Sequence, residues 1–229
     1  MNQNTKQILK GLGIGLGILG ILALLFKKSN SKKPKKILIV GDSQSAIVDS
    51  SGNKISFTYP NILKKILEPQ GYKIDVLAIG GKTTDWMKSN LPNQLTKNKY
   101  DRVYIYGGGN DTSNSSIKLD TTLNNIQKMV DMSLQSGADD VIVNLGWKIQ
   151  GDFGNYKIMP LTPYLSKKED WIPYVEKRKE LQRLIPQRIK NAKFIQPYDL
   201  KSLTKDGIHP TAQGHKIVAD VFLKSITND

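Results

Sequence analysis

Four residues in three short motifs have the side chains that acyl transfer requires. A fourth motif, IGGKTT, is rich in glycine. Ser43 ends GDS, Asn110 lies in GGND, and Asp206 and His209 belong to DGIHP, in a chain with only two histidines. A serine hydroxyl becomes a nucleophile when a base takes its proton, and histidine is the usual base near neutral pH. An aspartate orients that base, and N–H groups of glycine turns or an asparagine amide stabilise the oxyanion. These residue types predict ester hydrolysis.

Strands and helices are predicted to alternate along the chain, and this alternation decides where the motifs lie. Short runs rich in Val and Ile predict buried strands at 35–42, 72–81, 100–109, 139–146 and 191–199. Helices are predicted at about 58–69, 84–97, 115–136, 169–190 and 211–226. This alternation predicts a parallel sheet that is covered by helices on both faces. Because ligands of such sheets bind at the carboxyl ends of the strands, the motifs are expected to converge at one edge.

The four motifs, in this order, resemble those of the SGNH hydrolases, which are also called GDSL-like lipases and esterases. The first motif reads GDSQS and lacks the fuller GDSL ending, whereas the other three match without a missing residue. The resemblance covers about residues 36–226. It implies an α/β fold: a three-layer α/β/α sandwich with a mostly parallel, flavodoxin-like sheet of about five strands.

The resemblance also implies a role for each motif residue in an esterase that uses no metal and no cofactor. Ser43 is the implied nucleophile, His209 the general base and then acid, and Asp206 the residue that orients His209. The implied oxyanion hole consists of the Ser43 N–H, the Gly81 N–H, for which Gly80 is the alternative, and the Asn110 side chain.

Plainer interpretations exist for the same residues. Ser43 can cap a helix after a strand, and Asn110 and Asp111 can be turn or cap residues. The second histidine, His215, has no partner in the motif pattern and is expected to be a structural or surface residue of the last helix. The aromatic side chains of 147–172 are expected to pack in a long loop, and contact with a sugar or an acyl chain is the alternative.

The net charge of +14 lies mostly at the N-terminus, because residues 1–36 hold eight lysines and no acidic residue, which leaves +6 for the rest. No nucleic-acid-binding motif accompanies this charge, so no nucleic-acid partner is expected. The uncharged run 11–26 is flanked by lysines and predicts a single transmembrane anchor. A cleaved signal and a buried helix of a larger assembly, such as a virus particle, are the alternatives. The glycine spacing in this run also suits helix-mediated self-association.

The expected organisation is a membrane anchor at 1–28, a basic linker at 29–35 and an SGNH hydrolase domain at 36–229. The chain has no cysteine, which excludes thiol catalysis and disulfides. The expected function is a membrane-anchored serine esterase, on either side of the membrane, that removes O-acetyl groups from a carbohydrate or cell-surface polymer. A lipase or lysophospholipase acting on membrane lipids is the first alternative. A non-catalytic structural or binding component of a virion or envelope is the second.

Overall fold

The computed structural model describes residues 36–49, 51–148, 168–200, 203 and 208–227 of the 229-residue chain. The chain divides into two compact units. One unit is Pro34–Ala219, which contains the sheet and the motif residues that are described. The other comprises Met1–Lys33 and Asp220–Asp229, of which the end of the last helix is described.

The sheet has five parallel strands in the order β2-β1-β3-β4-β5. Their bounds are β1 Lys36–Gly41, β2 Lys73–Ala78, β3 Arg102–Tyr106, β4 Asp140–Asn144 and β5 Lys193–Ile195. β3 lies at the centre and is buried at every residue, in line with its run of large apolar side chains. The parallel pairing and this strand order confirm the predicted flavodoxin-like parallel sheet.

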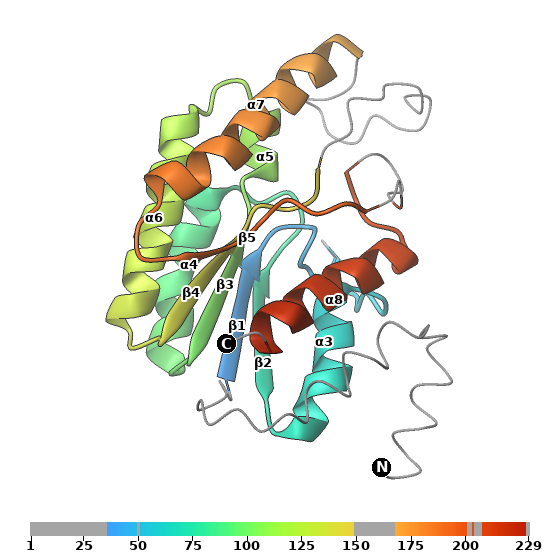
Figure 1. Ribbon diagram of the computed structural model, residues 1–229, viewed down its shortest axis with the longest axis vertical. Coiled ribbons are helices and arrows are strands. Elements are labelled where there is room, and N and C mark those ends of the chain that lie inside the picture. The colour runs from blue at the N-terminus through green and yellow to red at the C-terminus, as the bar shows by residue number, and fades with distance from the viewer. Residues whose placement is uncertain (1–35, 50, 149–167, 201–202, 204–207, 228–229) are drawn as a thin grey trace. The chain divides into compact units, whose positions relative to one another are not determined.

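Helices cover both faces of this sheet (Figure 1). On one face lie α4 Thr84–Lys97, α6 Leu119–Gln135 and α7 Lys168–Arg188, and on the other lie α3 Tyr59–Leu67 and residues 212–219 of α8 Ala212–Thr227. A short 3-10 turn, η1 Glu68–Gln70, follows α3. Strand side chains such as Val40 and Ile105 pack with Met87, Ile126 and Leu181 in one apolar core between the sheet and the first group of helices.

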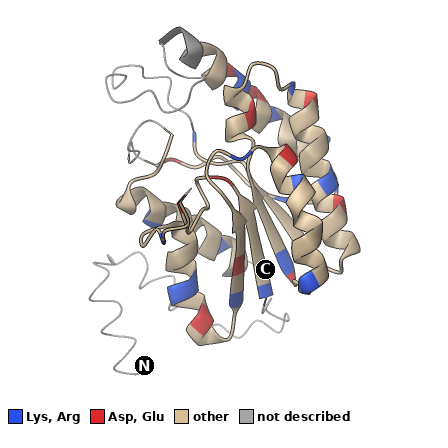
Figure 2. Ribbon diagram, turned by 180° about the vertical axis from the view of Figure 1, so that it is seen from behind, with Lys and Arg blue, Asp and Glu red and all other residues tan. Residues whose placement is uncertain are grey.

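The outer surface of these helices is strongly charged, and Figure 2 shows Lys and Arg interspersed with Asp and Glu along them. On α7, Lys179 pairs with Glu176 and Arg183 with Glu180, each three residues away along the exposed face. Such exposed pairs contribute little to stability, because water and salt screen them. The charged surface therefore keeps the helices solvated, and the apolar core holds them on the sheet.

Two boundaries differ from the sequence prediction. β3 ends at Tyr106 rather than at 109, because Gly108 adopts a positive φ of 97° and turns the chain into a short helix, α5 Gly109–Ser113. The next helix, α6, begins at Leu119 rather than at 115. There the Asn114 side chain accepts hydrogen bonds from the N–H and hydroxyl of Ser116, a local turn that competes with helix.

Two other predictions concern parts of the chain that are not described. The expected membrane anchor at 1–28 and linker at 29–35 lie outside the described residues, as does most of the aromatic loop. In the part that is described, no helix has both the length and the apolar character needed to cross a membrane. Trp147, at the start of that loop, is buried and packs edge-on against the Tyr106 ring, with ring centroids 6.1 Å apart. This side chain has the packing role that the sequence predicted.

Candidate active site

The hydroxyl of Ser43 lies next to the imidazole of His209 at the carboxyl edge of the sheet. Ser43 Oγ and His209 Nε2 are 2.9 Å apart, although 166 residues separate them in the chain. Both side chains are partly exposed, so a substrate can reach the pair. This distance allows direct proton transfer from the hydroxyl to the ring nitrogen. Asp206, the predicted partner of His209, lies outside the described residues.

The turn that presents Ser43 follows directly from the end of β1. The Ser45 N–H donates to the Asp42 carbonyl oxygen and the Gln44 N–H to Asp42 Oδ1, each at 3.0 Å. Gly41 is required at the start of this turn, because a Cβ there would collide with Ser45 Oγ and would lie 2.9 Å from the Tyr106 carbonyl oxygen. The GDS motif therefore forms a tight turn that places the Ser43 hydroxyl above the strand end.

The loop of His209 is held on both sides. Gln44 Nε2 donates to the carbonyl oxygen of Ile208 at 2.9 Å. On the other side, Gly214 in the first turn of α8 lies against this loop, because a Cβ there would meet the Leu203 carbonyl oxygen and, at 2.9 Å, Pro210 Cβ. The glycine after the histidine thus allows α8 to approach the loop closely.

The glycine motif forms a turn next to the nucleophile. The Lys82 N–H donates to the Ile79 carbonyl oxygen at 3.4 Å, and Gly81, the third residue, has the positive φ of 75° that a type II turn needs. A Cβ built on Gly80 would lie 3.7 Å from Ser43 Cβ, so the turn borders the serine directly. The turn's own hydrogen bond uses neither the Gly80 nor the Gly81 N–H. Both groups therefore remain candidates for the predicted oxyanion donor beside Ser43.

Asn110 lies on α5, across from this glycine turn. Its Nδ2 donates to the Lys82 carbonyl oxygen at 2.8 Å. A side-chain amide has two N–H donors, so one remains for a ligand while the other fixes the orientation of the amide. The plainer interpretation of Asn110 as a turn or cap residue does not describe this contact, because its amide reaches a separate loop 28 residues away.

Asp42, the residue before the nucleophile, is a buried carboxyl group. Burial raises the pKa of Asp42 to about 6, while its hydrogen bond from Gln44 and the positive charge of Arg178 act in the opposite direction. Arg178 comes from α7 and is itself 8% exposed. The negative charge of Asp42 is therefore present only above mildly acidic pH. Neither Arg178 nor Gln44 was predicted as part of this region.

His215 contacts Tyr59, and the expectation of a structural residue fits this contact. It is buried, and its Nδ1 accepts the N–H of Tyr59 at 3.3 Å. The His215 and Tyr59 rings stack, with centroids 6.4 Å apart. Tyr59 in turn shares a 2.7 Å hydrogen bond with Ser45 Oγ in the nucleophile turn. His215 thus joins the start of α8 to the start of α3.

Comparison with known proteins places this arrangement in a family. The model of the GDSL-like lipase/acylhydrolase family matches residues 39–217. The chain belongs to this family, and it is an SGNH-type serine hydrolase that acts on ester bonds. Comparison with curated protein sequences gives no significant match.

Solved structures with the same fold include an acetylxylan esterase, a lipase/acylhydrolase and TesA. A catalytic mutant of Axe2, an acetylxylan esterase from Geobacillus stearothermophilus, is 18% identical, with a TM-score of 0.65 over 86% of this chain and 96% of that chain. The lipase/acylhydrolase from Enterococcus faecalis is 20% identical, with a TM-score of 0.58 over 85% and 96%. TesA is 24% identical, with a TM-score of 0.59 over 83% and 99%. At these identities the likeness establishes the fold.

Proposed function

We propose that the chain is a serine esterase that removes O-acetyl groups from a carbohydrate or a cell-surface polymer, with Ser43, His209 and Asp206 as its catalytic triad. The observation that carries this proposal is the 2.9 Å contact between Ser43 Oγ and His209 Nε2 beside a glycine turn and an asparagine amide. A serine, a base and oxyanion donors at one point are what acyl transfer from an ester requires.

The proposed reaction has two halves. Ser43 Oγ attacks the ester carbonyl carbon while His209 Nε2 takes the hydroxyl proton, and the resulting oxyanion accepts hydrogen bonds from Asn110, Gly81 and the Ser43 N–H. The intermediate collapses, the acyl–oxygen bond breaks, and His209 returns the proton to the departing alcohol. Water then attacks the acyl-serine with His209 again as base, which releases the carboxylic acid and restores Ser43. Asp206 is assigned the orientation of His209, as in other triads.

Two observations support an acetylated polymer as the substrate. Residues 37–229 carry a net charge of +6, which suits an anionic polymer, and a similar structure, Axe2, is described as an acetylxylan esterase. The apolar run at 11–26 favours the alternative, a lipase or lysophospholipase on membrane lipids. A non-catalytic envelope or virion component is the remaining alternative, and it requires no function of the Ser43–His209 pair.

The test measures ester hydrolysis by the full-length protein and by Ser43→Ala. Acetylated oligosaccharides, p-nitrophenyl acetate and a long-chain p-nitrophenyl ester are the substrates. The proposal expects acetate release from at least one oligosaccharide and preference for the acetyl over the long-chain ester, both lost in Ser43→Ala. A long-chain preference points to the lipase alternative. Equal rates for wild type and Ser43→Ala on every ester overturn the catalytic proposal.

We also propose that residues 1–28 anchor the protein in a membrane, on the basis of the uncharged run and its flanking lysines. Fractionation of cells that express the full chain tests this, because an anchored protein stays in the membrane pellet after a carbonate wash. Recovery in the soluble fraction contradicts the anchor. Protease treatment of sealed vesicles then decides which side holds the catalytic domain.

A further inference from the structure

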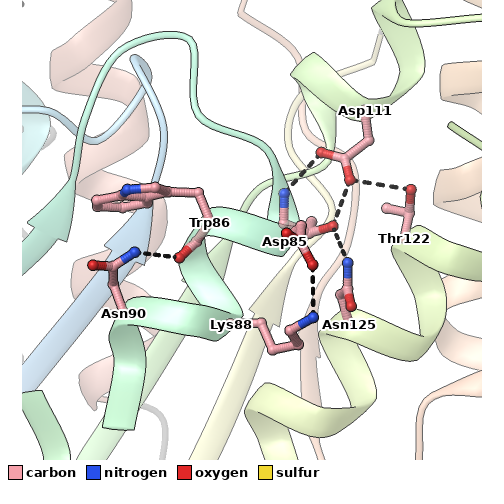
Figure 3. A network of polar contacts seen from close by, with 8 residues as sticks. Asp85, Trp86, Lys88, Asn90, Asp111, Thr122 and Asn125 are labelled. Carbon is pink, nitrogen blue, oxygen red and sulfur yellow. Dashed lines mark hydrogen bonds and ion pairs between the residues drawn. The ribbon is translucent and has the colours of Figure 1, made fainter. Parts of the chain in front are cut away.

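Asp111 is a buried carboxyl group one residue after the proposed oxyanion donor, and hydrogen-bond donors surround it. The side chain is 1% exposed. Its Oδ2 accepts the Thr84 N–H at 2.9 Å, and its Oδ1 accepts the hydroxyls of Thr84 and of Thr122. Asn125 Nδ2 donates to the Thr84 hydroxyl at 3.2 Å. Figure 3 shows the side chains of Asp111 on α5 and of Thr122 and Asn125 on α6 pointing toward one another.

The two ends of this network connect to the two parts of the proposed oxyanion hole. Thr84 begins α4, three residues after Gly81, so its N–H and hydroxyl fix the point where the glycine turn enters the helix. Asp111 follows Asn110 on α5. The turn and α5 are therefore joined by two contacts, Asn110 Nδ2 to the Lys82 carbonyl oxygen and Asp111 to Thr84.

α5 is also held from its other end. Lys177 of α7 donates from Nζ to the carbonyl oxygens of Ile117 at 2.6 Å and Asn114 at 2.8 Å, with a longer contact of 3.4 Å to that of Asp111. The Asn114 and Ile117 carbonyl groups follow the short helix and that of Asp111 lies within it. A helix of this length has too few residues to be stable alone. Lys177 therefore limits the movement of α5 away from the sheet edge, while Asp111 sets its position relative to the glycine turn.

We propose that Asp111 is a positioning residue of the oxyanion hole: its carboxyl group holds α5 and the glycine turn in register, so that the Asn110 amide and a glycine N–H point to the same oxygen. This role rests on the proposed function. Oxyanion donors act mainly on the transition state, where charge develops, and small misplacements weaken them strongly. Loss of Asp111 is therefore expected to lower kcat much more than it changes KM.

The replacement Asp111→Asn tests this role, because it keeps the shape of the side chain but turns one acceptor oxygen into a donor. The buried amide cannot accept from both the Thr84 N–H and the Thr84 hydroxyl as the carboxyl group does. On p-nitrophenyl acetate, kcat is expected to fall about 10- to 100-fold with KM within about twofold, since loss of a whole donor costs about 10²- to 10³-fold. The matched control is Asp140→Asn, a carboxyl group at the start of β4 that binds Arg102 and Lys193, which should lower Tm but keep kcat within about twofold.

A double-mutant cycle separates positioning from a general loss of stability. If Asp111 acts through the oxyanion donors, Asp111→Asn and Asn110→Ala together should cost clearly less in kcat than the product of the two separate losses. Thr84→Val removes one donor to Asp111 and nearly preserves the shape of the side chain. It should give a smaller loss of kcat with the same dependence on Asn110. This variant replaces Asp111→Asn in the cycle if Asp111→Asn does not fold.

Each outcome of these measurements has a distinct meaning. Two results overturn the positioning role alone, provided that wild type is faster than Ser43→Ala. One is that the kcat losses of Asp111→Asn and Asn110→Ala multiply in full. The other is that kcat is unchanged in both Asp111→Asn and Thr84→Val. A wild-type rate no higher than that of Ser43→Ala overturns the proposed function and this role with it. Failure of both Asp111→Asn and Thr84→Val to fold identifies the network as a folding element and also overturns the proposal.

Discussion

Gln44 and Ile208 join the two loops that carry the Ser43–His209 pair. Gln44 Nε2 donates to the Ile208 carbonyl oxygen at 2.9 Å, across 164 residues of sequence. Because Gln44 follows Ser43 and Ile208 precedes His209, this hydrogen bond ties the nucleophile turn to the loop of the base. The Gln44 side chain is also 8% exposed, so water cannot easily replace it in this role.

Gln44→Ala should therefore lower esterase activity without preventing folding. We expect kcat on p-nitrophenyl acetate to fall about 10-fold, as the His209 loop becomes less well placed, with a stability loss of about 1 kcal/mol for the lost hydrogen bond. Gln70→Ala is the matched control, because Gln70 Nε2 also donates to a backbone carbonyl, that of Ile66, but on an exposed turn. A Gln44→Ala enzyme with wild-type kcat contradicts the role of this bond.

Gly214→Ala should be harmful although alanine is the better helix former. In a helix interior the change would usually stabilise by about 1 kcal/mol. Here the added Cβ would press on the Leu203 carbonyl oxygen and on Pro210, so the His209 loop must move. We expect both Tm and kcat to decrease. Gln213→Ala, an exposed neighbour in the same helix, should change neither, and a stabilised, fully active Gly214→Ala protein would contradict the close approach.

The sequence predicts the fold and the meeting of Ser43 and His209 for a common reason. Runs such as ILIV and VYIY have the length and apolar character of buried strands, and parallel strands bring their carboxyl ends to one edge. Residues that end these strands, or that lie in a loop above them, are therefore brought together.

Other parts of the site leave no pattern in the sequence. α5 has five residues, too few for helical periodicity, so Asn110 and Asp111 could not be placed on a helix. Gln44 and Arg178 act through contacts between distant segments, and Arg178 lies on a helix whose sequence is mostly polar. The burial of His215 is likewise decided by Tyr59, on another helix.

The buried carboxyl group of Asp42 should make folding stability fall as pH rises from about 4 to 6. Its pKa is raised from 3.8 to about 6 in the folded protein, so the folded state binds more protons than the unfolded state in this window. This loss of folding stability is absent below the pKa of the unfolded state and reaches its full value of about 3 kcal/mol above pH 6. Denaturant unfolding of wild type and Asp42→Asn across pH 4–7 measures it: wild type should lose about this much relative to the variant. A constant difference contradicts the raised pKa.

Arg178→Met should move the same transition to higher pH. The positive charge of Arg178 lowers the pKa of Asp42, against the larger effect of burial. Without that charge, the fall in stability should extend above pH 6 rather than end there. The same unfolding series measures this, with Arg188→Met, whose side chain pairs with Asp120 on the exposed surface, as the control. An unchanged pH profile in Arg178→Met shows that the two groups do not interact.

The Asn110 amide should contribute to the reaction far more than to folding. Asn110→Ala removes both N–H donors, and loss of one oxyanion donor typically lowers kcat by about 10²- to 10³-fold with little change in KM. The lost bond to the Lys82 carbonyl oxygen should cost only about 1 kcal/mol of stability, because this carbonyl lies in a partly exposed turn. Asn114→Ala is the matched control at the other end of α5, where the side chain accepts from the N–H and hydroxyl of Ser116. Steady-state rates on p-nitrophenyl acetate and thermal unfolding of both variants measure the two effects. Equal kcat values for Asn110→Ala and Asn114→Ala would show that the amide takes no part in stabilising the oxyanion.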